Sequence, residues 1–219
     1  MTSASTAVLD MCVYKTMAGV LGEFVLGNLD IQSDPTRRNS MPYACDSVRR
    51  VALDIASATV ISIVDFPVQD LLGNKYRVEL ASVNPNYIGK PYCYAYALTW
   101  HMGGSPRYED MGLLKIDLCT GERVHSGALP KDTATVTGYS KTGVYFGEPV
   151  FVADPAGKAE DDGVLLIVSR DGPTQSTRLI ILNARDFSEV ASVQSPFPLM
   201  FEFHGQFFPA QPSIAEQSL

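Results

Sequence analysis

The sequence is poor in the residues that several common functional sites require. It holds only three histidines, and none of its four cysteines pairs at the C-x-x-C spacing of zinc ribbons and dithiol redox sites. Acidic residues outnumber basic ones by 24 to 17, which argues against a nucleic-acid-binding groove. We therefore expect no nucleic-acid partner, and we expect the cysteines to be the reduced, buried thiols of a cytosolic protein.

Long apolar runs and a basic leader are also missing. Runs such as VLLIV and LIIL are far shorter than the roughly 20 residues of a membrane-spanning helix. The first residues, MTSASTAVLDM, carry no basic residue before the first apolar run, so we expect no secretory signal. With 219 residues, 46% of them hydrophobic and 19% charged, the chain is predicted to be globular with a sizeable core.

Short strands separated by turns dominate the sequence after Val48. Segments rich in β-branched or aromatic residues are each bounded by Gly, Pro, Asp or Asn, which is typical of strands. They are VRRVALDI, ATVISIVDF, PYCYAYALTW, MGLLKIDL, EPVFVAD, GVLLIVSR, RLIILNA and EVASVQS. Residues 113–124 and 179–190 share the pattern strand, polar turn, strand, and such recurring hairpins indicate an all-β propeller or sandwich.

One helix is predicted ahead of these strands, from Tyr14 to Leu29. Met17, Leu21, Phe24 and Val25 recur there at helical spacing, although glycines weaken the segment. The polar, proline-containing stretch that follows, QSDPTRRNSMP, is predicted to be a loop.

An acidic run, AEDDG, occupies residues 159–163. A calcium loop needs ligands at alternating positions within a longer pattern, and the residues around this run do not supply it. We interpret the run as a solvated turn between two strands.

The stretch FEFHGQFFP, residues 201–209, places a histidine among aromatic residues. His204 is either a core histidine with a local hydrogen bond or a residue that faces a metal or a substrate. The nonapeptide alone favours the core histidine, because a lone histidine is weak evidence for ligation. The other histidines, His101 in LTWHMGG and His125 in ERVHSG, are predicted to lie at strand ends or in turns.

Taken in order, these motifs resemble the carotenoid cleavage oxygenase family, which includes β-carotene oxygenases and the retinoid isomerohydrolase of the retinal pigment epithelium. The most specific parts are EPVF with the downstream EDDGVL, the run LNARDFSEV, and the ending FHGQF. The resemblance extends from about Thr6 to Pro209. It implies an all-β seven-bladed β-propeller, and residues 1–219 would form one partial carotenoid oxygenase domain with the C-terminal blades of an incomplete propeller.

The resemblance also implies a site. Members of the family hold a ferrous ion, Fe(2+), with four histidines, and His204 matches the last of these ligands. Glu148 in GEPVF and Glu79 in VELASVN match glutamates that hydrogen-bond iron-bound imidazoles, which fixes the imidazole tautomer and raises its basicity. Phe203 and Phe207 are then expected in the wall of the substrate tunnel, with ordinary core packing as the alternative.

The same resemblance leads to a geometric prediction. Glu148 should accept a hydrogen bond from the ring of His204, with an oxygen roughly 2.6–3.2 Å from one ring nitrogen. The other ring nitrogen should face open space, and Glu79 should point toward the same region. If Glu148 and His204 are unrelated strand residues instead, no contact and a solvent-facing Glu148 are expected.

The implied activity is oxidative cleavage of a C=C bond in carotenoids or apocarotenoids with O2, which gives two carbonyl products. Isomerohydrolysis of retinyl esters is the alternative within the family. Because two of the three histidines match no family ligand, we expect the chain to be a C-terminal fragment that is inactive alone. Two alternatives are a non-catalytic β-sheet fragment that binds an apolar ligand or a protein partner, and a propeller interaction module. We expect a cytoplasmic protein, with peripheral membrane contact in the full-length family member.

Overall fold

The computed structural model describes residues 6–13, 47–69, 76, 78–99, 111–120, 134–199 and 204–209. The predicted helix at 14–29, His101, His125 and Phe203 lie outside these residues. The described part of the chain is almost entirely strands and turns, with a short 3-10 helix, η2 (Pro85–Tyr87), and this confirms the all-β prediction. None of its helices is long and apolar enough to cross a membrane.

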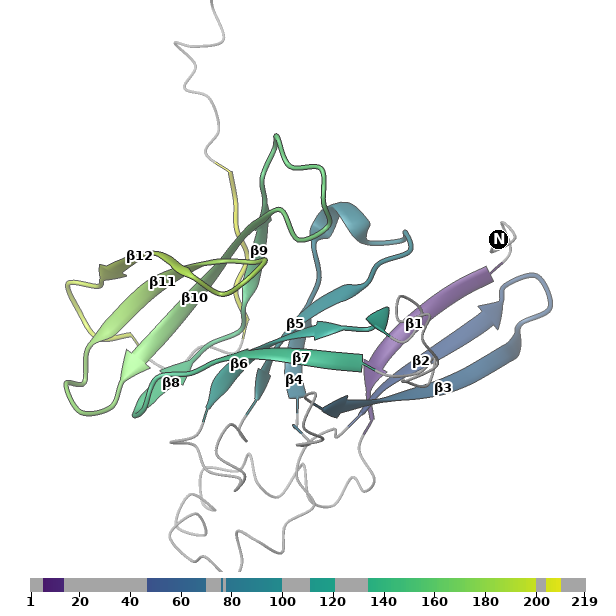
Figure 1. Ribbon diagram of the computed structural model, residues 1–219, viewed down its shortest axis with the longest axis horizontal. Helices are drawn as coiled ribbons and strands as arrows, with labels where there is room; N and C mark the ends of the chain where they lie inside the picture. Colours follow the sequence, from purple (N-terminus) through teal and green to yellow (C-terminus); the bar gives the residue numbers. More distant parts are fainter. Residues whose placement is uncertain are drawn as a thin grey trace, which may run out of the picture.

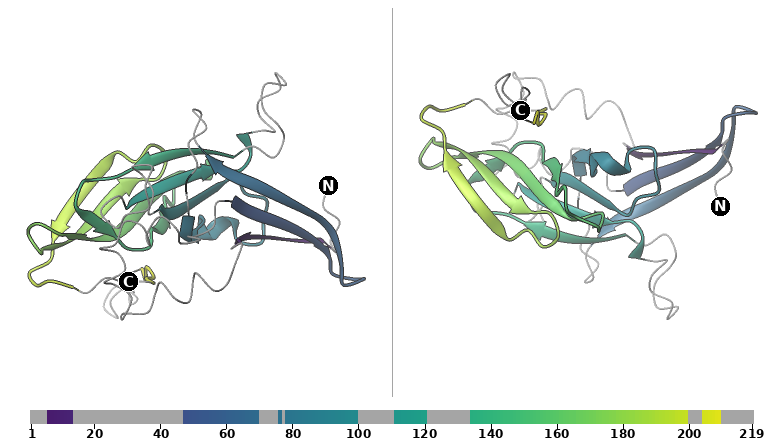
Figure 2. Two further views of the ribbon diagram at one scale, coloured as in Figure 1. Left: turned by 90° about the horizontal axis from the view of Figure 1, so that it is seen from below. Right: turned by 90° about the horizontal axis from the view of Figure 1, so that it is seen from above.

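The first of two sheets has seven strands in the order β1-β2-β3-β7-β6-β5-β4. Neighbouring strands run antiparallel except β3 and β7, which are parallel. The strands are β1 (Thr6–Cys12), β2 (Ser47–Asp54), β3 (Thr59–Gln69), β4 (Val78–Ser82), β5 (Tyr94–Thr99), β6 (Gly112–Asp117) and β7 (Ala134–Tyr139). Figures 1 and 2 show β1–β3 extending away from the rest of the molecule.

The second sheet has five strands, β12-β11-β10-β8 with β9 also paired to β10. They are β8 (Val144–Phe146), β9 (Val150–Ala153), β10 (Gly163–Asp171), β11 (Thr177–Asn183) and β12 (Glu189–Gln194). Both β8 and β9 pair with β10, with the residues 147–149 between them. The sheet lies at the end of the molecule opposite to β1–β3 (Figure 2).

All eight predicted strands are present, as β2, β3, β5, β6 and β9–β12, and the prediction omitted β1, β4, β7 and β8. β7 is rich in threonine and glycine, ATVTGY, so its few apolar residues give only a weak strand signal. β8 has only three residues, which is too short to show a period. The strongly apolar segments of β10 and β11, by contrast, alternate between buried and half-buried residues as a sheet over a core should.

Two clusters of buried apolar side chains hold the sheets together. In the first, Leu165, Ile167 and Leu182 of the five-stranded sheet pack with Tyr96 and Leu98 of β5. The second lies within the seven-stranded sheet, where Phe66 and Val68 of β3 pack with Ile116 of β6. Each fully buried Leu, Ile or Phe contributes about 1.5–3 kcal/mol relative to an exposed one, so the first cluster is a major source of cohesion between the sheets.

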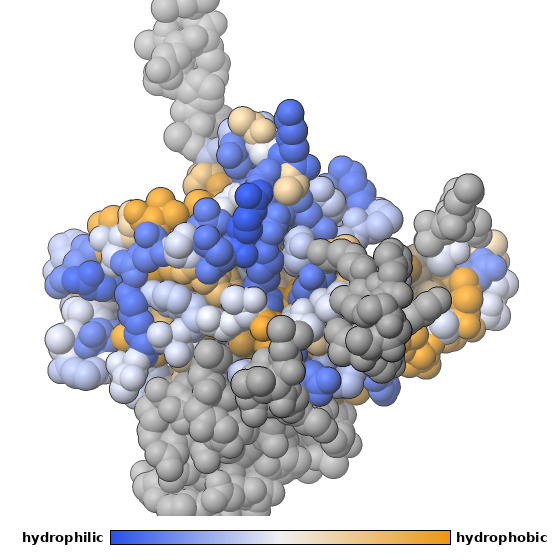
Figure 3. Space-filling model, viewed as in Figure 1, coloured by the Kyte–Doolittle hydropathy of each residue, from blue (hydrophilic) through white to orange (hydrophobic). Residues whose placement is uncertain are grey.

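Apolar side chains remain exposed on strands β1 and β3. Leu9 is 48% exposed, and Val60, Ile61 and Ile63 are each 56–57% exposed. Figure 3 shows this apolar surface at the end of the molecule that β1–β3 form. Exposed apolar side chains gathered in this way are typical of surfaces that contact another polypeptide or a ligand.

Cys93 and Cys119 form a disulfide, which corrects the expectation that the cysteines are reduced. Cys93 directly precedes β5 and Cys119 follows β6 by two positions. These strands pair antiparallel with Tyr94 opposite Asp117, so the two cysteines meet at a Cα–Cα distance of 5.2 Å. They are 26 residues apart in sequence, and only the pairing of the strands brings them together.

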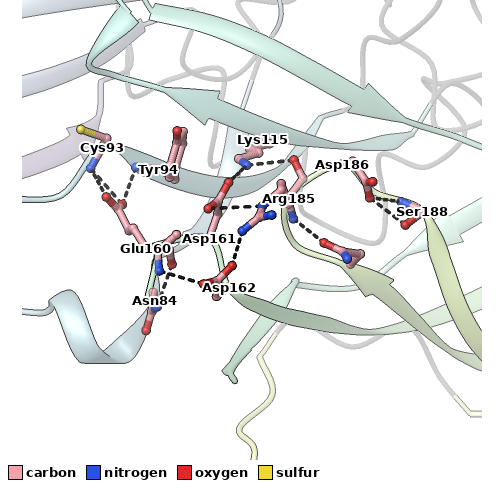
Figure 4. A network of polar contacts seen from close by, with 12 residues as sticks. Asn84, Cys93, Tyr94, Lys115, Glu160, Asp161, Asp162, Arg185, Asp186 and Ser188 are labelled. Carbon is pink, nitrogen blue, oxygen red and sulfur yellow. Dashed lines mark hydrogen bonds and ion pairs between the residues drawn. The ribbon is translucent and has the colours of Figure 1, made fainter. Parts of the chain in front are cut away.

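The acidic run at 159–163 does lie in a turn between two strands, β9 and β10, but it is not solvated, which is a second correction. The Glu160 carboxylate accepts hydrogen bonds from the backbone N–H of Cys93 at 2.9 Å and of Tyr94 at 2.6 Å. Its backbone carbonyl accepts from Nδ2 of Asn84 at 2.8 Å. The run therefore connects the β9–β10 hairpin of one sheet to the start of β5 in the other (Figure 4).

Asp161 makes the most buried of these connections. Asp161 and Lys115 are each 8% exposed, and their carboxylate oxygen and Nζ lie 2.7 Å apart. Lys115 also donates to the carbonyl of Arg185 at 2.9 Å and lies 4.2 Å from the ring centroid of Tyr94. The prediction of solvation failed because the partners of the run come from the start of β5, from β6 and from the loop after β11, far away in sequence. We call Lys115, Glu160, Asp161, Asp162 and Arg185 the acidic seam.

Candidate metal-ligand site

Glu148 lies at the break between β8 and β9. The N–H of Gly147 still donates to the carbonyl of Val168 on β10 at 2.8 Å. Pro149 has no N–H, so the residue after Glu148 cannot donate a ladder hydrogen bond. Its carbonyl instead accepts from Oγ of Ser82 at 2.6 Å. The break is thus fastened on both sides of Glu148, by β10 and by the end of β4.

The predicted contact between Glu148 and His204 is present. Oε2 of Glu148 lies 3.3 Å from Nδ1 of His204, slightly beyond the expected range, and 3.3 Å from the backbone nitrogen of Gly205. The His204 side chain is 76% exposed and the Glu148 side chain 18%. His204 is therefore not a core histidine, and Glu148 does not face open solvent. Because Nδ1 faces the carboxylate, Nε2 is the ring nitrogen left for a metal.

A pocket of about 230 Å³ opens beside this pair. Its apolar floor comes from β9, β10 and β11, and its other wall comes from the residues that follow His204. The lining residues are Gly147, Glu148, Val150, Leu166, Val168, Leu179 and His204–Phe208. The volume lies below the roughly 300–1,000 Å³ of complete small-molecule sites, so these residues form part of a wall rather than a whole binding site.

Phe207 lines this pocket and is 44% exposed, so it is not an ordinary core residue. Its predicted role in binding substrate stays a prediction, and so does that of Phe203, which lies outside the described residues. The pocket combines apolar walls with one imidazole–carboxylate pair. Such a lining suits an apolar ligand that is held next to a single polar group.

Glu79 is placed differently. It lies on β4 opposite Leu98 of β5, and its Oε1 atom is buried. It is not among the residues that line the pocket. Ser82 on the same strand contacts Pro149, so β4 does reach the break that carries Glu148. The structure thus brings Glu148 and His204 together, and a role for Glu79 toward a metal stays a prediction.

The described residues do not make a complete metal site. Within the ranges that the structure describes, no group of three or more His, Cys, Asp or Glu side chains is placed to hold a metal ion. His204 and Glu148 fit the roles of one ligand and its orienting carboxylate, since the contact leaves Nε2 available. One imidazole with its partner is not an iron site, and we assign no reaction step through iron to these residues.

Sequence reasoning missed the residues that fasten this site. Ser82 bonds the backbone of Pro149, and Arg170 and Thr177 bond the backbone of Leu199, which in each case comes from another element. Serine, threonine and arginine at such positions carry no recognisable pattern, because any exposed strand contains them. Only the proline after Glu148 signals in the sequence that the strand is interrupted there.

The profile of the retinal pigment epithelial membrane protein family matches residues 2–209. The chain belongs to this family. The match covers both Glu148 and His204, and it agrees with the resemblance to carotenoid cleavage oxygenases found from the motifs.

Curated relatives of this family member are oxygenases of carotenoids. The mouse β,β-carotene 15,15′-dioxygenase is 33% identical over 134 residues, which are 60% of this chain and 20% of that protein. The apocarotenoid-15,15′-oxygenase of Synechocystis is 31% identical over 133 residues, 59% of this chain and 24% of that protein. A torulene dioxygenase of Fusarium fujikuroi is 32% identical over 133 residues, with a coverage of 60% and 20%. The matched segments thus make up between a fifth and a quarter of these relatives.

Solved structures show the same fold. A crystal structure of an ACO/RPE65 chimera superposes with a TM-score of 0.65 at 24% identity, covering 95% of this chain and 38% of the chimera. Cobalt-substituted Synechocystis ACO gives a TM-score of 0.62 at 23% identity, covering 93% and 37%. This family member therefore has the fold of a little over a third of those structures.

Proposed function

We propose that this chain supplies an iron-ligating histidine and its carboxylate partner to a dioxygenase that cleaves a C=C bond of carotenoids or apocarotenoids with O2. The observation that carries the proposal is the 3.3 Å contact between Nδ1 of His204 and Oε2 of Glu148, which are 56 residues apart in sequence. Membership of a family whose curated relatives are named as carotenoid oxygenases supports it. Isomerohydrolysis of retinyl esters is the competing activity within the family.

The residues of the chain have defined tasks under this proposal. The carboxylate of Glu148 holds the proton of His204 on Nδ1 and so directs the lone pair of Nε2 outward. Fe(2+), when bound, would supply the activation of dioxygen. The apolar floor formed by Val150, Leu166 and Leu179 would contact the hydrocarbon of the substrate and keep water away from it.

Finer parts of the expectation belong to the same proposal. The chain would form C-terminal blades of a seven-bladed β-propeller, and the likeness of its fold to the ACO/RPE65 chimera supports this. Glu79 would orient a further imidazole, and Phe203 and Phe207 would line the path of the polyene. In this arrangement the remaining iron ligands come from polypeptide other than the described residues.

The location of the protein is a separate part of the proposal. We propose a cytoplasmic protein, with the full-length family member touching a membrane peripherally. The Cys93–Cys119 disulfide favours an oxidising compartment instead, because disulfides are rare in the cytosol, so the state of these two cysteines in the cell decides this part. Cell fractionation combined with thiol labelling of the native protein tests this part. Recovery in a secretory compartment with no reactive thiol at these positions would contradict it.

The main test uses the longest gene product that contains this sequence, loaded with Fe(2+) without oxygen and then incubated with β-carotene or an apocarotenal in air. Chromatography should show aldehyde products. We expect His204→Ala to abolish them and Glu148→Gln to reduce iron affinity or activity about 10–100-fold, because the carboxylate orients the ligand. Gln206→Ala, in the same pocket wall, is the matched control. Full activity of His204→Ala would refute the proposal.

A second measurement concerns the chain of 219 residues by itself. We predict that after Fe(2+) loading it holds far less than one iron per chain and releases no aldehyde from β-carotene. The reason is that the described residues supply one ligand and not a full set. Iron near one per chain together with aldehyde products would show that the ligand argument is wrong.

A second candidate function is a non-catalytic module that binds an apolar ligand, and the apolar floor of the pocket favours it. Adding a retinoid to such a module would quench the tyrosine fluorescence of the protein. The extent of quenching would be the same with and without Fe(2+). His204→Ala would leave this binding unchanged. The response to His204→Ala in the cleavage assay therefore separates the two functions.

A further inference from the structure

The described residues that follow β12 lie against the five-stranded sheet, and His204 is among them. We call these described parts, residues 195–199 and 204–209, the C-terminal strap. The second part lines the pocket together with Leu166, Val168 and Leu179 of β10 and β11. The contacts between the strap and these strands therefore decide where His204 lies relative to Glu148.

The strap begins with a turn that cannot continue the sheet. Its sequence is Ser-Pro-Phe-Pro-Leu, and Pro196 and Pro198 have no N–H to donate. Oγ of Ser195 donates to the carbonyl of Phe197 at 2.6 Å, which closes the turn locally. The backbone of Leu199 then returns to the sheet.

Both backbone groups of Leu199 are held by one cross-strand pair. Its N–H donates to Oγ1 of Thr177 at 2.9 Å, and its carbonyl accepts from Nη1 of Arg170 at 3.1 Å. Thr177 is 2% exposed and lies opposite Arg170 in the β10–β11 ladder. A buried threonine hydroxyl and a guanidinium at neighbouring positions thus form a clamp around a single peptide residue.

The contacts of His204 itself are weak anchors. The His204 side chain is 76% exposed, and the contacts of His204 and Gly205 with Glu148 are both 3.3 Å long. Exposed interactions of this kind contribute little on their own. Leu199 is the nearest residue before His204 that the structure describes, so its contacts are the next described anchor of the imidazole.

The clamp fixes the backbone close before His204 in sequence. Leu199 lies five residues before His204, whereas Ser195, whose N–H donates to the carbonyl of Thr177 at 2.8 Å, lies nine residues before it, nearly twice as far. Doubling the number of residues between two contacts lowers the probability that the chain brings them together about threefold. We infer that Thr177 and Arg170 are positioning residues, which act through Leu199 to keep His204 against Glu148. This inference rests on the proposed function only in regarding His204 as a metal ligand.

The test is amide hydrogen exchange in the metal-free chain, measured for each residue by NMR. In Thr177→Val the Leu199 amide should exchange about tenfold faster, as the loss of one hydrogen bond allows. The Gly205 amide, remote from the substitution, should exchange about threefold faster. Amides in the middle of the β10–β11 ladder should keep their rates. Thr177→Ser retains the hydroxyl and should restore both strap amides, and Thr174→Val is the matched control in the adjoining turn.

A second variant guards against a folding defect. Arg170→Met retains the length of the side chain and removes its donors to the Leu199 carbonyl and to Oε1 of Gln175. The Leu199 carbonyl keeps its 3.5 Å contact with Oγ1 of Thr177, so the same pattern should appear more weakly. If Gly205 keeps its rate while Leu199 exchanges faster, the clamp secures the turn alone and the inference is wrong. A uniform rise across β10 and β11 in both variants would refute it too. Because this experiment uses no metal, its result would stand even if the proposed dioxygenase activity were absent. Conversely, failure of this inference would leave the proposed function untouched.

Discussion

Two carboxylates flank the same strand, β9, and their surroundings are opposite. Asp161, after β9, lies with Lys115 in the acidic seam, where the two side chains are only 11% and 10% exposed and their atoms are 2.7 Å apart. Glu148, before β9, meets a histidine whose side chain is 76% exposed, at 3.3 Å. One hairpin thus presents one carboxylate to the junction between the sheets and the other to a pocket.

The comparison separates a role in folding from a role in function. A buried ion pair is costly to break, because the partner that remains is a buried charge without compensation. An exposed pair contributes only about 0–1 kcal/mol. The fold therefore depends on Asp161 and has little need of the contact between Glu148 and His204. That contact is better explained by what it does to the imidazole.

The largest effect is expected in the seam. Asp161→Ala should destabilise the protein by about 3–5 kcal/mol, because it leaves the Lys115 ammonium buried without its partner. Urea denaturation followed by circular dichroism measures the change. The double variant Lys115→Met with Asp161→Leu should recover much of the loss, since apolar residues of similar volume replace both charges. A loss below about 1 kcal/mol in Asp161→Ala would mean that the Asp161–Lys115 pair contributes no more than an ordinary surface ion pair.

The disulfide should rank next. Cys93→Ser opens a loop of 26 residues and should cost about 3–4 kcal/mol through the entropy of the unfolded chain. Urea denaturation without reductant measures this cost, and Cys12→Ser, a cysteine outside this disulfide, is the matched control. Reductant should bring the wild type to the stability of the variant. Equal stabilities of wild type and Cys93→Ser without reductant would contradict the prediction.

The dependence of the unfolding free energy on pH tests the role of Asp162, which lies at the exposed border of the acidic seam. Backbone N–H groups of Ala159 and Lys158 and the charge of Arg185 lower the pKa of Asp162. A lowered pKa in the folded state adds stability above the ordinary carboxyl value of about 4, and this stability is lost as the pH falls through the folded-state pKa. Asp162→Asn should therefore flatten the fall in unfolding free energy below about pH 4. An identical acid profile of the variant would refute this.

The smallest effect on stability is expected at the pocket. Glu148→Gln should change the unfolding free energy by no more than about 0.5 kcal/mol, because its partner is largely in water. The measurement is the same urea denaturation, side by side with Asp161→Ala. A loss above about 2 kcal/mol would mean that Glu148 has a structural role like that of Asp161, and the comparison between the two carboxylates would fail.

The sequence allowed the strands with clear apolar alternation to be predicted, because period and turn residues are local properties. It also allowed the pairing of Glu148 with His204 to be predicted, but only through the family resemblance. The disulfide, the acidic seam and the clamp on Leu199 were out of reach. Each joins residues from different elements, so it depends on which strands become neighbours, and no local pattern encodes that. AEDDG illustrates this, since its composition suggests solvent while its partners in β5 and β6 bury it.

The most direct test of the account is the tautomer of His204 in the metal-free chain, observed by ¹⁵N–¹H NMR of the imidazole at one fixed alkaline pH. If Glu148 orients the ring for a metal, the proton should reside mainly on Nδ1 and leave Nε2 unprotonated. Glu148→Gln should remove that preference without unfolding the protein. A proton mainly on Nε2 in the wild type, or a tautomer that does not change in Glu148→Gln, would contradict the claim that this pair is built to hold a metal.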